Sequence, residues 1–203
     1  MKQTLYNLNY DTKWKFCSYW HQIVEIAKCF SGRVLQVGIG NKFIHDYLAK
    51  IGINIFSIDI EKDLSPGLVA SVLHLPFKSN SYDVVACFEV LEHLRFEDFL
   101  KSLSELHRVA KHKVILSLPD VNHYFVLNLS VPFYGIARKI LTYNFSMKKN
   151  VKVCHDHYWE IGLDGYPLSK IMKNIQKVGF FIEKQYRVFE NPYHRFFVLK
   201  KQS

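Results

Sequence analysis

Between residues 33 and 118 the apolar positions switch repeatedly between two spacings, one typical of buried strands and one typical of helices. Continuous apolar runs predict strands at 33–38, 53–59, 68–72, 82–88 and 113–118. Apolar residues three or four positions apart predict two helices between these strands, with stripes at Ile44, Leu48 and Ile51 and at Phe96, Phe99, Leu103, Leu106 and Ala110. Strands that alternate with helices predict a parallel sheet with right-handed crossovers.

Both ends of the chain add elements to this pattern. The N-terminal region, residues 1–30, predicts a helix from about residue 11, with a stripe at Trp14, Cys17, Val24 and Ala27 and with Trp20 and Ile23 nearby. The alternation then stops over 121–165. Beyond it, a helix that ends at Gly179 and a hairpin of two strands are predicted at 167–178, 180–188 and 195–199. The chain is therefore predicted to be an α/β protein with seven strands.

The composition is that of a globular protein, and we expect residues 1–203 to form a single domain. Hydrophobic residues make up 49% of the chain and charged residues 22%, which are ordinary fractions for such a protein. Four cysteines without a Cys-x-x-Cys pair favour reduced thiols, at Cys17, Cys29, Cys87 and Cys154. No signal-peptide core and no apolar stretch of membrane-spanning length occurs, so a cytoplasmic protein is predicted.

The net charge of +9 has two interpretations. An excess of lysine and arginine attracts nucleic acid or an anionic lipid surface. It is also typical of a solvated lysine coat, which we favour because no dense basic run occurs. The nearest approach to such a run comprises Arg138, Lys139, Lys148, Lys149 and Lys152.

Two glycines, Gly38 and Gly40, follow the first predicted strand at the point where it turns into a helix. Without side chains, the backbone there can turn sharply and approach a ligand closely. Asp59 ends the next strand, 19 residues after Gly40, near the spacing of a carboxylate that accepts hydrogen bonds from ribose hydroxyls. Phe43 occupies the position of the third glycine of a dinucleotide motif. Together these residues favour a nucleoside pocket at the carboxyl edge of the sheet.

The order of these signals, together with segments 70–77 and 82–93, resembles the class I S-adenosylmethionine-dependent methyltransferases. The resemblance is closest to the small (type 11-like) group whose fourth strand ends in a Leu-Glu-His helix start. It implies a Rossmann-like three-layer sandwich with a seven-stranded, mostly parallel sheet whose last strand is antiparallel. It also implies S-adenosyl-L-methionine as cofactor, bound by Gln36, Val37, Gly38, Gly40, Asp59, Ile60, Ser71, Val72, Leu73 and Phe88.

Three positions depart from the family pattern. Gln36 stands where an acidic residue is usual, so an amide would hold the methionine end of the cofactor. Lys42 replaces a third glycine, and Ser71 replaces a common Asp near the adenine amine. Since polar substitutes still form hydrogen bonds, we expect weaker cofactor binding rather than none.

Candidate bases gather at the end of the fourth strand. Methyl transfer from a sulfonium needs alignment of the acceptor, the methyl group and the sulfur, and a group that removes a proton. We expect Glu89 and His93 to be the catalytic residues. If a helix begins at Glu89, then Glu89, Glu92 and His93 share one face and could also hold Mg²⁺ or Mn²⁺.

Similar Glu-x-x-Glu-His groups bind a metal in the quinone-precursor O-methyltransferases and the small-RNA 2′-O-methyltransferases. The latter add a downstream histidine, for which His157 is the nearest candidate. The simpler alternative is that Glu92 and His93 brace the helix and line the substrate pocket. A divalent metal is therefore a second interpretation and not the favoured one. We expect the seven other histidines outside 155–157 to be surface or structural residues.

The resemblance makes 121–165 a substrate cap. Its aromatic residues are Tyr124, Phe125, Phe133, Tyr134, Tyr143, Phe145, Tyr158 and Trp159. They could enclose an aromatic, glycan or acyl substrate, stack nucleobases, rest on a bilayer through 132–141, or form a lid packed on the sheet. We expect O- or N-methylation of a small-molecule, glycan or lipid-linked acceptor. The alternatives are an RNA 2′-O-methyltransferase, with nucleic acid not favoured, and a non-catalytic protein that binds S-adenosylmethionine. No oligomeric state is predicted.

Overall fold

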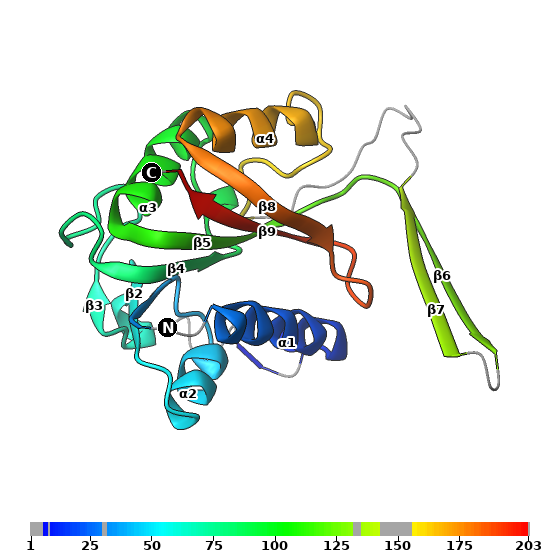
Figure 1. The fold of residues 1–203 in the computed structure, drawn as a ribbon, viewed down its shortest axis with the longest axis horizontal. Coiled ribbons are helices and arrows are strands. Elements are labelled where there is room, and N and C mark those ends of the chain that lie inside the picture. Colours follow the sequence, from blue (N-terminus) through cyan, green and yellow to red (C-terminus); the bar gives the residue numbers. More distant parts are fainter. Residues whose placement is uncertain (1–5, 8, 30–31, 132–134, 143–155, 203) are drawn as a thin grey trace.

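The computed structural model describes residues 6–7, 9–29, 32–131, 135–142 and 156–202 (Figure 1). Within them the strands are β1 (Val34–Val37), β2 (Ile55–Asp59), β3 (Leu68–Val69), β4 (Tyr82–Phe88), β5 (Ala110–Pro119), β6 (Tyr124–Val131), β7 (Gly135–Thr142), β8 (Phe180–Arg187) and β9 (His194–Lys201). The helices are α1 (Lys13–Lys28), α2 (Phe43–Lys50), α3 (Phe99–Val109) and α4 (Leu168–Lys177), with 3₁₀ turns η2 (Lys62–Leu64), η3 (Leu91–His93) and η4 (Phe96–Asp98). Several residues singled out above lie outside the described ranges: Phe133, Tyr134, Tyr143, Phe145, Lys148, Lys149, Lys152 and Cys154.

One seven-stranded sheet, in the order β3-β2-β1-β4-β5-β9-β8, forms the middle layer. Helices α1 and α2 cover one face of this sheet and α3 and α4 cover the other (Figure 1). The pairs from β3 through β5 are parallel, whereas β9 is antiparallel to both β5 and β8. The predicted three-layer α/β sandwich with an antiparallel last strand is confirmed.

The strand order places a topological switch point between β1 and β4. The chain goes from β1 outward to β2 and β3, and then returns to the other side of β1 as β4. In register, Val37 pairs with Ile58 of β2 and with Cys87 of β4. The residues that follow these three strands therefore meet at one edge of the sheet, which is where ligands bind in open α/β sheets.

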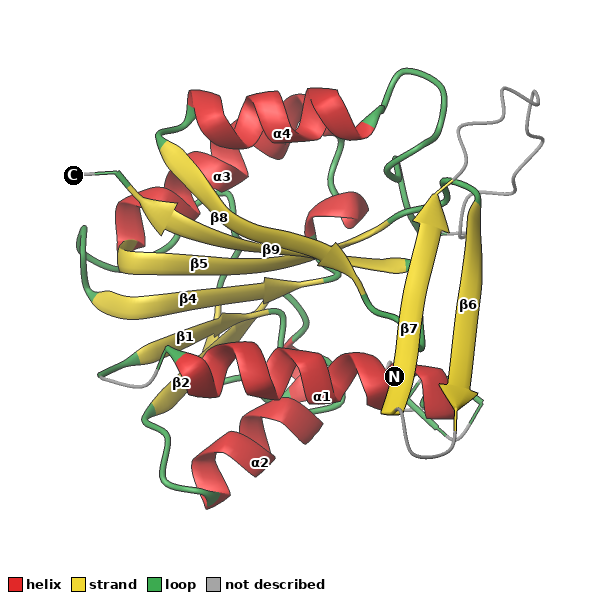
Figure 2. Cartoon of the chain, turned by 45° about the vertical axis from the view of Figure 1, so that its right-hand side comes forward, coloured by secondary structure: helices red, strands yellow, loops and turns green. Residues whose placement is uncertain are grey.

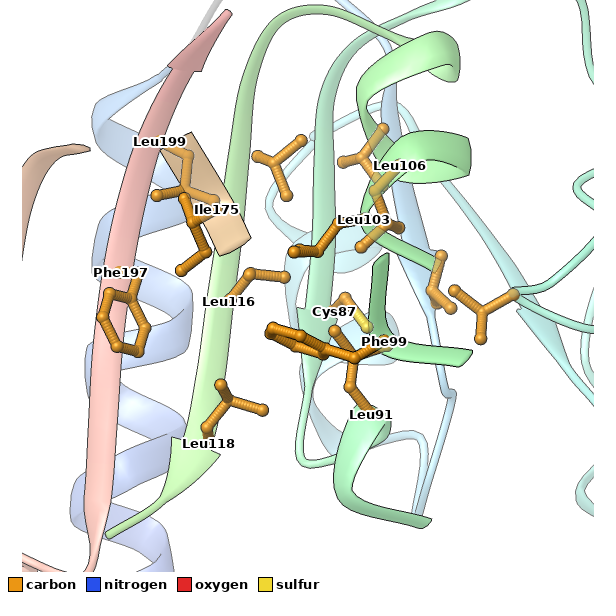
Figure 3. Close-up of a cluster of buried hydrophobic side chains, with 14 of the residues drawn as sticks. Cys87, Leu91, Phe99, Leu103, Leu106, Leu116, Leu118, Ile175, Phe197 and Leu199 are labelled. Carbon is orange, nitrogen blue, oxygen red and sulfur yellow. The ribbon is translucent and has the colours of Figure 1, made fainter. Parts of the chain in front are cut away.

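Two hydrophobic cores lie on opposite faces of the sheet. The larger packs α3 and α4 on the sheet and includes Phe99, Leu103 and Ile175 (Figure 3). The smaller packs α1 and α2 and includes Ile26 and Leu48. These stripes have the three- and four-residue spacing of helices, so the periodicity predicted which helix faces are buried.

Some predicted stripe positions are wrong. Trp14 and Trp20 are 54% and 61% exposed, whereas the polar side chain of Ser18 is fully buried in α1. Ser18 is tolerated there because its hydroxyl lies 2.8 Å from Nδ1 of His194. Ile51 is 51% exposed because α2 ends one residue before it.

Strands β6 and β7 form a hairpin in a segment for which no strand was predicted. Figure 2 shows this ribbon beside the main sheet and not joined to it. Tyr124, Phe125 and Leu127 are 47%, 57% and 46% exposed, so the alternative of a lid packed on the sheet is wrong for these side chains. The available signal was two runs rich in Val, Ile, Leu and Tyr on either side of Gly135.

Arg187 fixes the base of this hairpin. Its buried guanidinium donates to the carbonyls of Asp120 at 2.8 Å and Asn122 at 3.0 Å, and it lies 4.6 Å from the ring centroid of Tyr124. The carboxylate of Asp120 accepts a hydrogen bond from Arg195 at 2.6 Å. A lone two-stranded hairpin is only marginally stable, so this anchor matters for its position.

Candidate functional site

One carboxylate joins the turn after β1 to the end of β2. Asp59 accepts a hydrogen bond from the Ile39 amide at its Oδ2 and from the Glu61 amide at its Oδ1, both at 2.9 Å. Gly38 and Gly40 adopt left-handed backbone conformations, with φ of +83° and +56°. The Asp59 carboxylate is thus oriented beside the glycine turn at the carboxyl edge of the sheet.

The two glycines have different environments. A Cβ on Gly38 would lie 2.4 Å from Cγ2 of Val90, whereas a Cβ on Gly40 would meet just the Tyr6 hydroxyl, at 3.9 Å, within 4 Å among the described residues. Lys42, at the position of the third family glycine, is also left-handed, with φ of +66°. This conformation costs a side-chain-bearing residue about 1–2 kcal/mol. Lysine in place of the family glycine at position 42 therefore strains the backbone. The space beside Gly40 stays open.

Gln36 is buried just before the turn. Its Nε2 donates to the Gly38 carbonyl at 3.1 Å, while its Oε1 has no hydrogen-bond partner among the described residues. A buried acceptor without a partner costs about 1–3 kcal/mol. The amide at this position thus offers an unused acceptor to a ligand.

The segment predicted to line the adenine begins with a side-chain turn. The Ser71 hydroxyl accepts a hydrogen bond from the Leu73 amide at 3.2 Å, so this amide is already engaged. Val72 is 5% exposed and packs into the larger core. Ser71 and Leu73 are half-buried and form the surface of the segment.

Two side chains of α3 hold the same segment in place. Glu105 accepts a hydrogen bond from the Leu75 amide at 2.8 Å, and Arg108 donates to the carbonyls of Leu75 at 2.9 Å and Phe77 at 2.6 Å. The hydrogen bond from Arg108 to Glu105 lowers the pKa of the Glu105 carboxyl. Neither residue was identified from the sequence, although opposite charges three positions apart on a predicted helix were the available signal.

Three further predicted cofactor residues differ in exposure. Ile60 is 68% exposed beside Asp59 and offers an open apolar surface. Val37 and Phe88 are buried in the cores on opposite faces of the sheet, and the Phe88 ring lies 6.0 Å from that of Phe196. The side chains of Val37 and Phe88 therefore support the site from within the protein.

Glu89 follows β4 in a left-handed conformation, with φ of +52°. Such strain in a residue other than glycine is concentrated at functional sites. Its Oε2 lies 3.7 Å from Nε2 of His194, and its buried Oε1 has no hydrogen-bond partner among the described residues. His194 was expected to be a surface or structural residue, and the strand pattern carried no sign of its contact with Glu89.

Glu92 lies in the 3₁₀ turn η3 and is fully buried. Burial, and then the nearby carboxyl of Glu89, raise the pKa of Glu92 well above its ordinary value. The expected α-helix from Glu89 does not form, because Glu89 is left-handed and only a 3₁₀ turn follows. Glu89 therefore does not share one helical face with Glu92 and His93.

His157 instead lies beside His93, with their ring centroids 4.7 Å apart. Nδ1 of His93 is 2.9 Å from the carbonyl oxygen of Asp156, and Nδ1 of His157 is 2.7 Å from Oε1 of Glu160. Potential ligand atoms of Glu92, His93 and His157 all lie within 4.8 Å of one another. The structure thus brings His157 to Glu92 and His93, whereas Glu89 lies near the Glu92 carboxyl but outside this cluster.

A cavity of about 600 Å³ opens beside Gly40. Aromatic and charged side chains line it, among them Tyr6, Phe16, Phe43 and Lys42. Ligand pockets in proteins typically have volumes of about 300–1,000 Å³. Of the predicted cofactor residues only Gly40 lines this cavity, so the cavity reaches the glycine turn from the side of α2.

Comparison with known proteins agrees with this arrangement. Residues 35–118 match the model of a family described as a methyltransferase domain. A 1,6-didemethyltoxoflavin-N1-methyltransferase of Burkholderia thailandensis is similar in fold, with a TM-score of 0.62 and 10% identity over 97% of this chain and 82% of that one. Magnesium protoporphyrin IX methyltransferase of Synechocystis is similar with a TM-score of 0.62 and 15% identity over 97% and 89%.

The match to a curated relative covers a shorter part of the chain. An uncharacterized protein of Methanocaldococcus jannaschii is 46% identical over 55 residues, which are 27% of this chain and 23% of that protein. The chain thus matches less than a quarter of the relative's length. The match over residues 35–118 and the shared fold agree with the predicted resemblance to the class I S-adenosylmethionine-dependent methyltransferases. In the part of the chain that the structure describes, no helix is long and apolar enough to cross a bilayer.

Proposed function

We propose that this protein transfers a methyl group from S-adenosylmethionine to an oxygen or nitrogen of a small-molecule, glycan or lipid-linked acceptor. The observation that carries the proposal is the hydrogen bond from the Ile39 amide to Asp59. It holds a carboxylate beside an open glycine turn at the switch point of the sheet. A nucleoside bound at this edge would present its ribose hydroxyls to Asp59.

The residues present fit this cofactor. The unused Oε1 of Gln36 can accept a hydrogen bond from the ammonium group of the methionine part. The open space beside Gly40 admits the ligand backbone, and the exposed side chain of Ile60 can cover one face of the adenine. When bound, S-adenosylmethionine supplies an electrophilic methyl group on its sulfonium.

We assign proton removal from the acceptor to Glu89, with His93 as the second candidate. Glu89 lies directly after β4, and its side chain is 22% exposed, so an acceptor molecule can reach it. Its Oε1 has no hydrogen-bond partner among the described residues and can accept a proton. A base must lie within hydrogen-bond reach of the proton that it abstracts. Nδ1 of His93 is engaged by the Asp156 carbonyl, so its Nε2 is the nitrogen that can accept a proton.

The acceptor class rests on the exposed surface near the site. Tyr124 and Phe125 present aromatic rings on the hairpin that follows β5, which suits a flat or hydrophobic acceptor. The two structural neighbours are named for small-molecule acceptors, didemethyltoxoflavin and magnesium protoporphyrin IX. Both observations support a small acceptor over nucleic acid.

Calorimetric titration with S-adenosylmethionine and S-adenosylhomocysteine tests the cofactor part of the proposal. We expect wild type to bind both, and Asp59→Ala to bind at least about tenfold more weakly, equivalent to about 1.4 kcal/mol. Asp164→Ala removes an exposed carboxylate before α4 and should bind as wild type does. A folded wild-type protein that binds neither ligand would refute the proposal. Binding without transfer to any acceptor in a screen with methyl-labelled cofactor would favour a non-catalytic binding protein.

A further inference from the structure

Glu92 is the polar group of the site that the proposed function leaves unexplained. It is fully buried, and neither carboxylate oxygen has a hydrogen-bond partner among the described residues. Removing a carboxylate from water is costly, so buried carboxylates in native proteins are paired with a cation or coordinate a metal. A cation bound at this place would supply the partner that both Glu92 oxygens lack among the described residues.

The neighbours of Glu92 are two imidazoles held in one tautomer. A carbonyl oxygen can only accept a hydrogen bond, so Nδ1 of His93 carries the hydrogen that it donates to Asp156. Nδ1 of His157 likewise donates to the carboxylate of Glu160. Each ring is thereby left with a lone pair on Nε2. Carbonyl and carboxylate partners on Nδ1 are the usual outer contacts of a metal-bound histidine.

The outer contacts are themselves held rigidly. Glu160 is 1% exposed and also accepts a hydrogen bond from the Tyr193 hydroxyl at 2.8 Å. The amide of Tyr158 donates to the Glu92 carbonyl at 2.8 Å, which docks the segment of His157 on the turn that carries Glu92 and His93. The three side chains thus converge through contacts of their own segments, as a preorganised ligand site requires.

We propose that Glu92, His93 and His157 bind a divalent transition-metal ion through one carboxylate oxygen and the two Nε2 atoms. Two imidazole nitrogens favour Zn²⁺, Mn²⁺ or Co²⁺, whereas Mg²⁺ and Ca²⁺ prefer oxygen ligands. This differs from the sequence-based alternative, in which Glu89 belonged to the ligand set and the ion was a hard one. In the structure the Glu89 carboxyl lies near both His194 and the Glu92 carboxyl, but it is not part of the cluster formed by Glu92, His93 and His157.

Three protein ligands leave a position open, as in catalytic metal sites. That position would take the hydroxyl oxygen of an acceptor, whose pKa the ion lowers. During transfer the new C–O bond forms while the bond from the methyl carbon to sulfur breaks, the thioether leaves uncharged, and the hydroxyl proton passes to Glu89. This role rests on the proposed methyl transfer and selects an oxygen acceptor; the metal site itself does not depend on it.

Titration of the full-length, tag-free protein with Co²⁺ tests the site, because Co²⁺ bound by nitrogen and oxygen ligands absorbs visible light. We expect one Co²⁺ per chain, displaced by Zn²⁺ but not by equimolar Mg²⁺. His157→Ala and Glu92→Gln should each weaken binding by about tenfold or more. His112→Ala, which removes an imidazole that is 58% exposed outside this cluster, should leave binding unchanged. If Glu92→Gln fails to fold, His157→Ala decides.

No Co²⁺ binding by wild type, or equal binding by wild type and His157→Ala, would overturn the metal site. Titration of the same samples with S-adenosylmethionine separates the two proposals. A protein that binds the cofactor but not Co²⁺ refutes only the metal site. A protein that binds Co²⁺ at these residues but not the cofactor refutes only the proposed methyl transfer.

Discussion

A Cβ on Gly38 would lie 2.4 Å from Cγ2 of Val90. This contact joins the turn after β1 to the residue that follows the strained Glu89. The turn faces the expected methionine end of the cofactor, and Glu89 is the proposed base. The close approach of Gly38 and Val90 therefore couples the geometry of the proposed cofactor pocket to that of the proposed base at the end of β4.

Substituting Gly38 should destabilise the protein more than substituting a glycine of similar backbone conformation in open space. Gly38 and Gly52 have φ of +83° and +88°, but a Cβ at Gly52 would meet nothing within 4 Å. We expect Gly52→Ala to lower the free energy of unfolding by about 1–2 kcal/mol through backbone strain. Gly38→Ala should lower the free energy of unfolding by about a further 1–3 kcal/mol, because the added methyl group overpacks the contact with Val90. Urea denaturation measures both, and equal losses would show that Val90 moves aside at little cost.

Breaking the Glu105–Arg108 pair should loosen the segment that carries Ser71 and Leu73. The hydrogen bond from Arg108 lowers the pKa of Glu105 below its ordinary value of 4.5. The associated stability is therefore present above about pH 4.5 and is lost as the pH falls through the lower folded-state pKa. Since the Arg108 side chain is 34% exposed, solvent screens the pair and we expect Glu105→Gln to cost about 1 kcal/mol near neutral pH.

Unfolding of Glu105→Gln and wild type at neutral pH and near pH 3 measures this effect. The difference between the two proteins should shrink at the lower pH. Glu97→Gln, which changes an exposed carboxylate of η4, is the matched control and should unfold as wild type does at both pH values. A difference for Glu105→Gln that is independent of pH would contradict the charge-based explanation.

His194 should make stability fall in mild acid. Burial lowers the pKa of His194 from its ordinary value of 6.5, while Glu89 acts in the opposite direction. The folded protein therefore binds this proton less readily than the unfolded chain, and stability is lost as the pH falls below about 6.5. Replacing the imidazole in His194→Gln should reduce this loss between pH 7 and pH 5.

An exposed histidine provides the control for the pH dependence of His194→Gln. His112 is 58% exposed, and His112→Gln should keep the wild-type dependence of unfolding free energy on pH. Burial also lowers the pKa values of His21, His93 and His107, so a part of the slope should persist in His194→Gln. Identical slopes for wild type and His194→Gln would rule His194 out as a contributor.

Trp159 should be essential for docking the segment that carries His157. It is fully buried, donates a hydrogen bond to the Leu94 carbonyl at 3.1 Å, and packs 5.1 Å and 5.0 Å from the rings of Phe96 and Phe99. We expect Trp159→Ala to cost about 3–5 kcal/mol because it leaves a cavity. Thermal or urea unfolding measures the loss. Trp20→Ala removes an indole that is 61% exposed and should cost far less; similar losses would contradict the assigned role.

The local pattern of the sequence predicted most of the sheet. Each predicted strand is present, and β5 even extends beyond its predicted range, because burial between two helical layers demands continuous apolar runs. Strand β3 is shorter than predicted, at Leu68–Val69, since an edge strand is held by one neighbour only. The β6–β7 hairpin was missed because core burial was the signal used, and the described side chains of β6, at 124–128, do not join either core.

The sequence by itself determined the alternation of strands and helices and the spacing of Gly38, Gly40 and Asp59, because both depend on residues close together in the chain. Only the tertiary structure decided that His157 lies beside His93 and Glu92 and that His194 lies beside Glu89. These contacts join distant segments, and they form only after the residues following β5 and the strand β9 have packed against the end of β4. A left-handed backbone at Glu89, which no helical pattern predicts, keeps the proposed base off the 3₁₀ turn that carries Glu92 and His93, although its carboxyl still lies near that of Glu92.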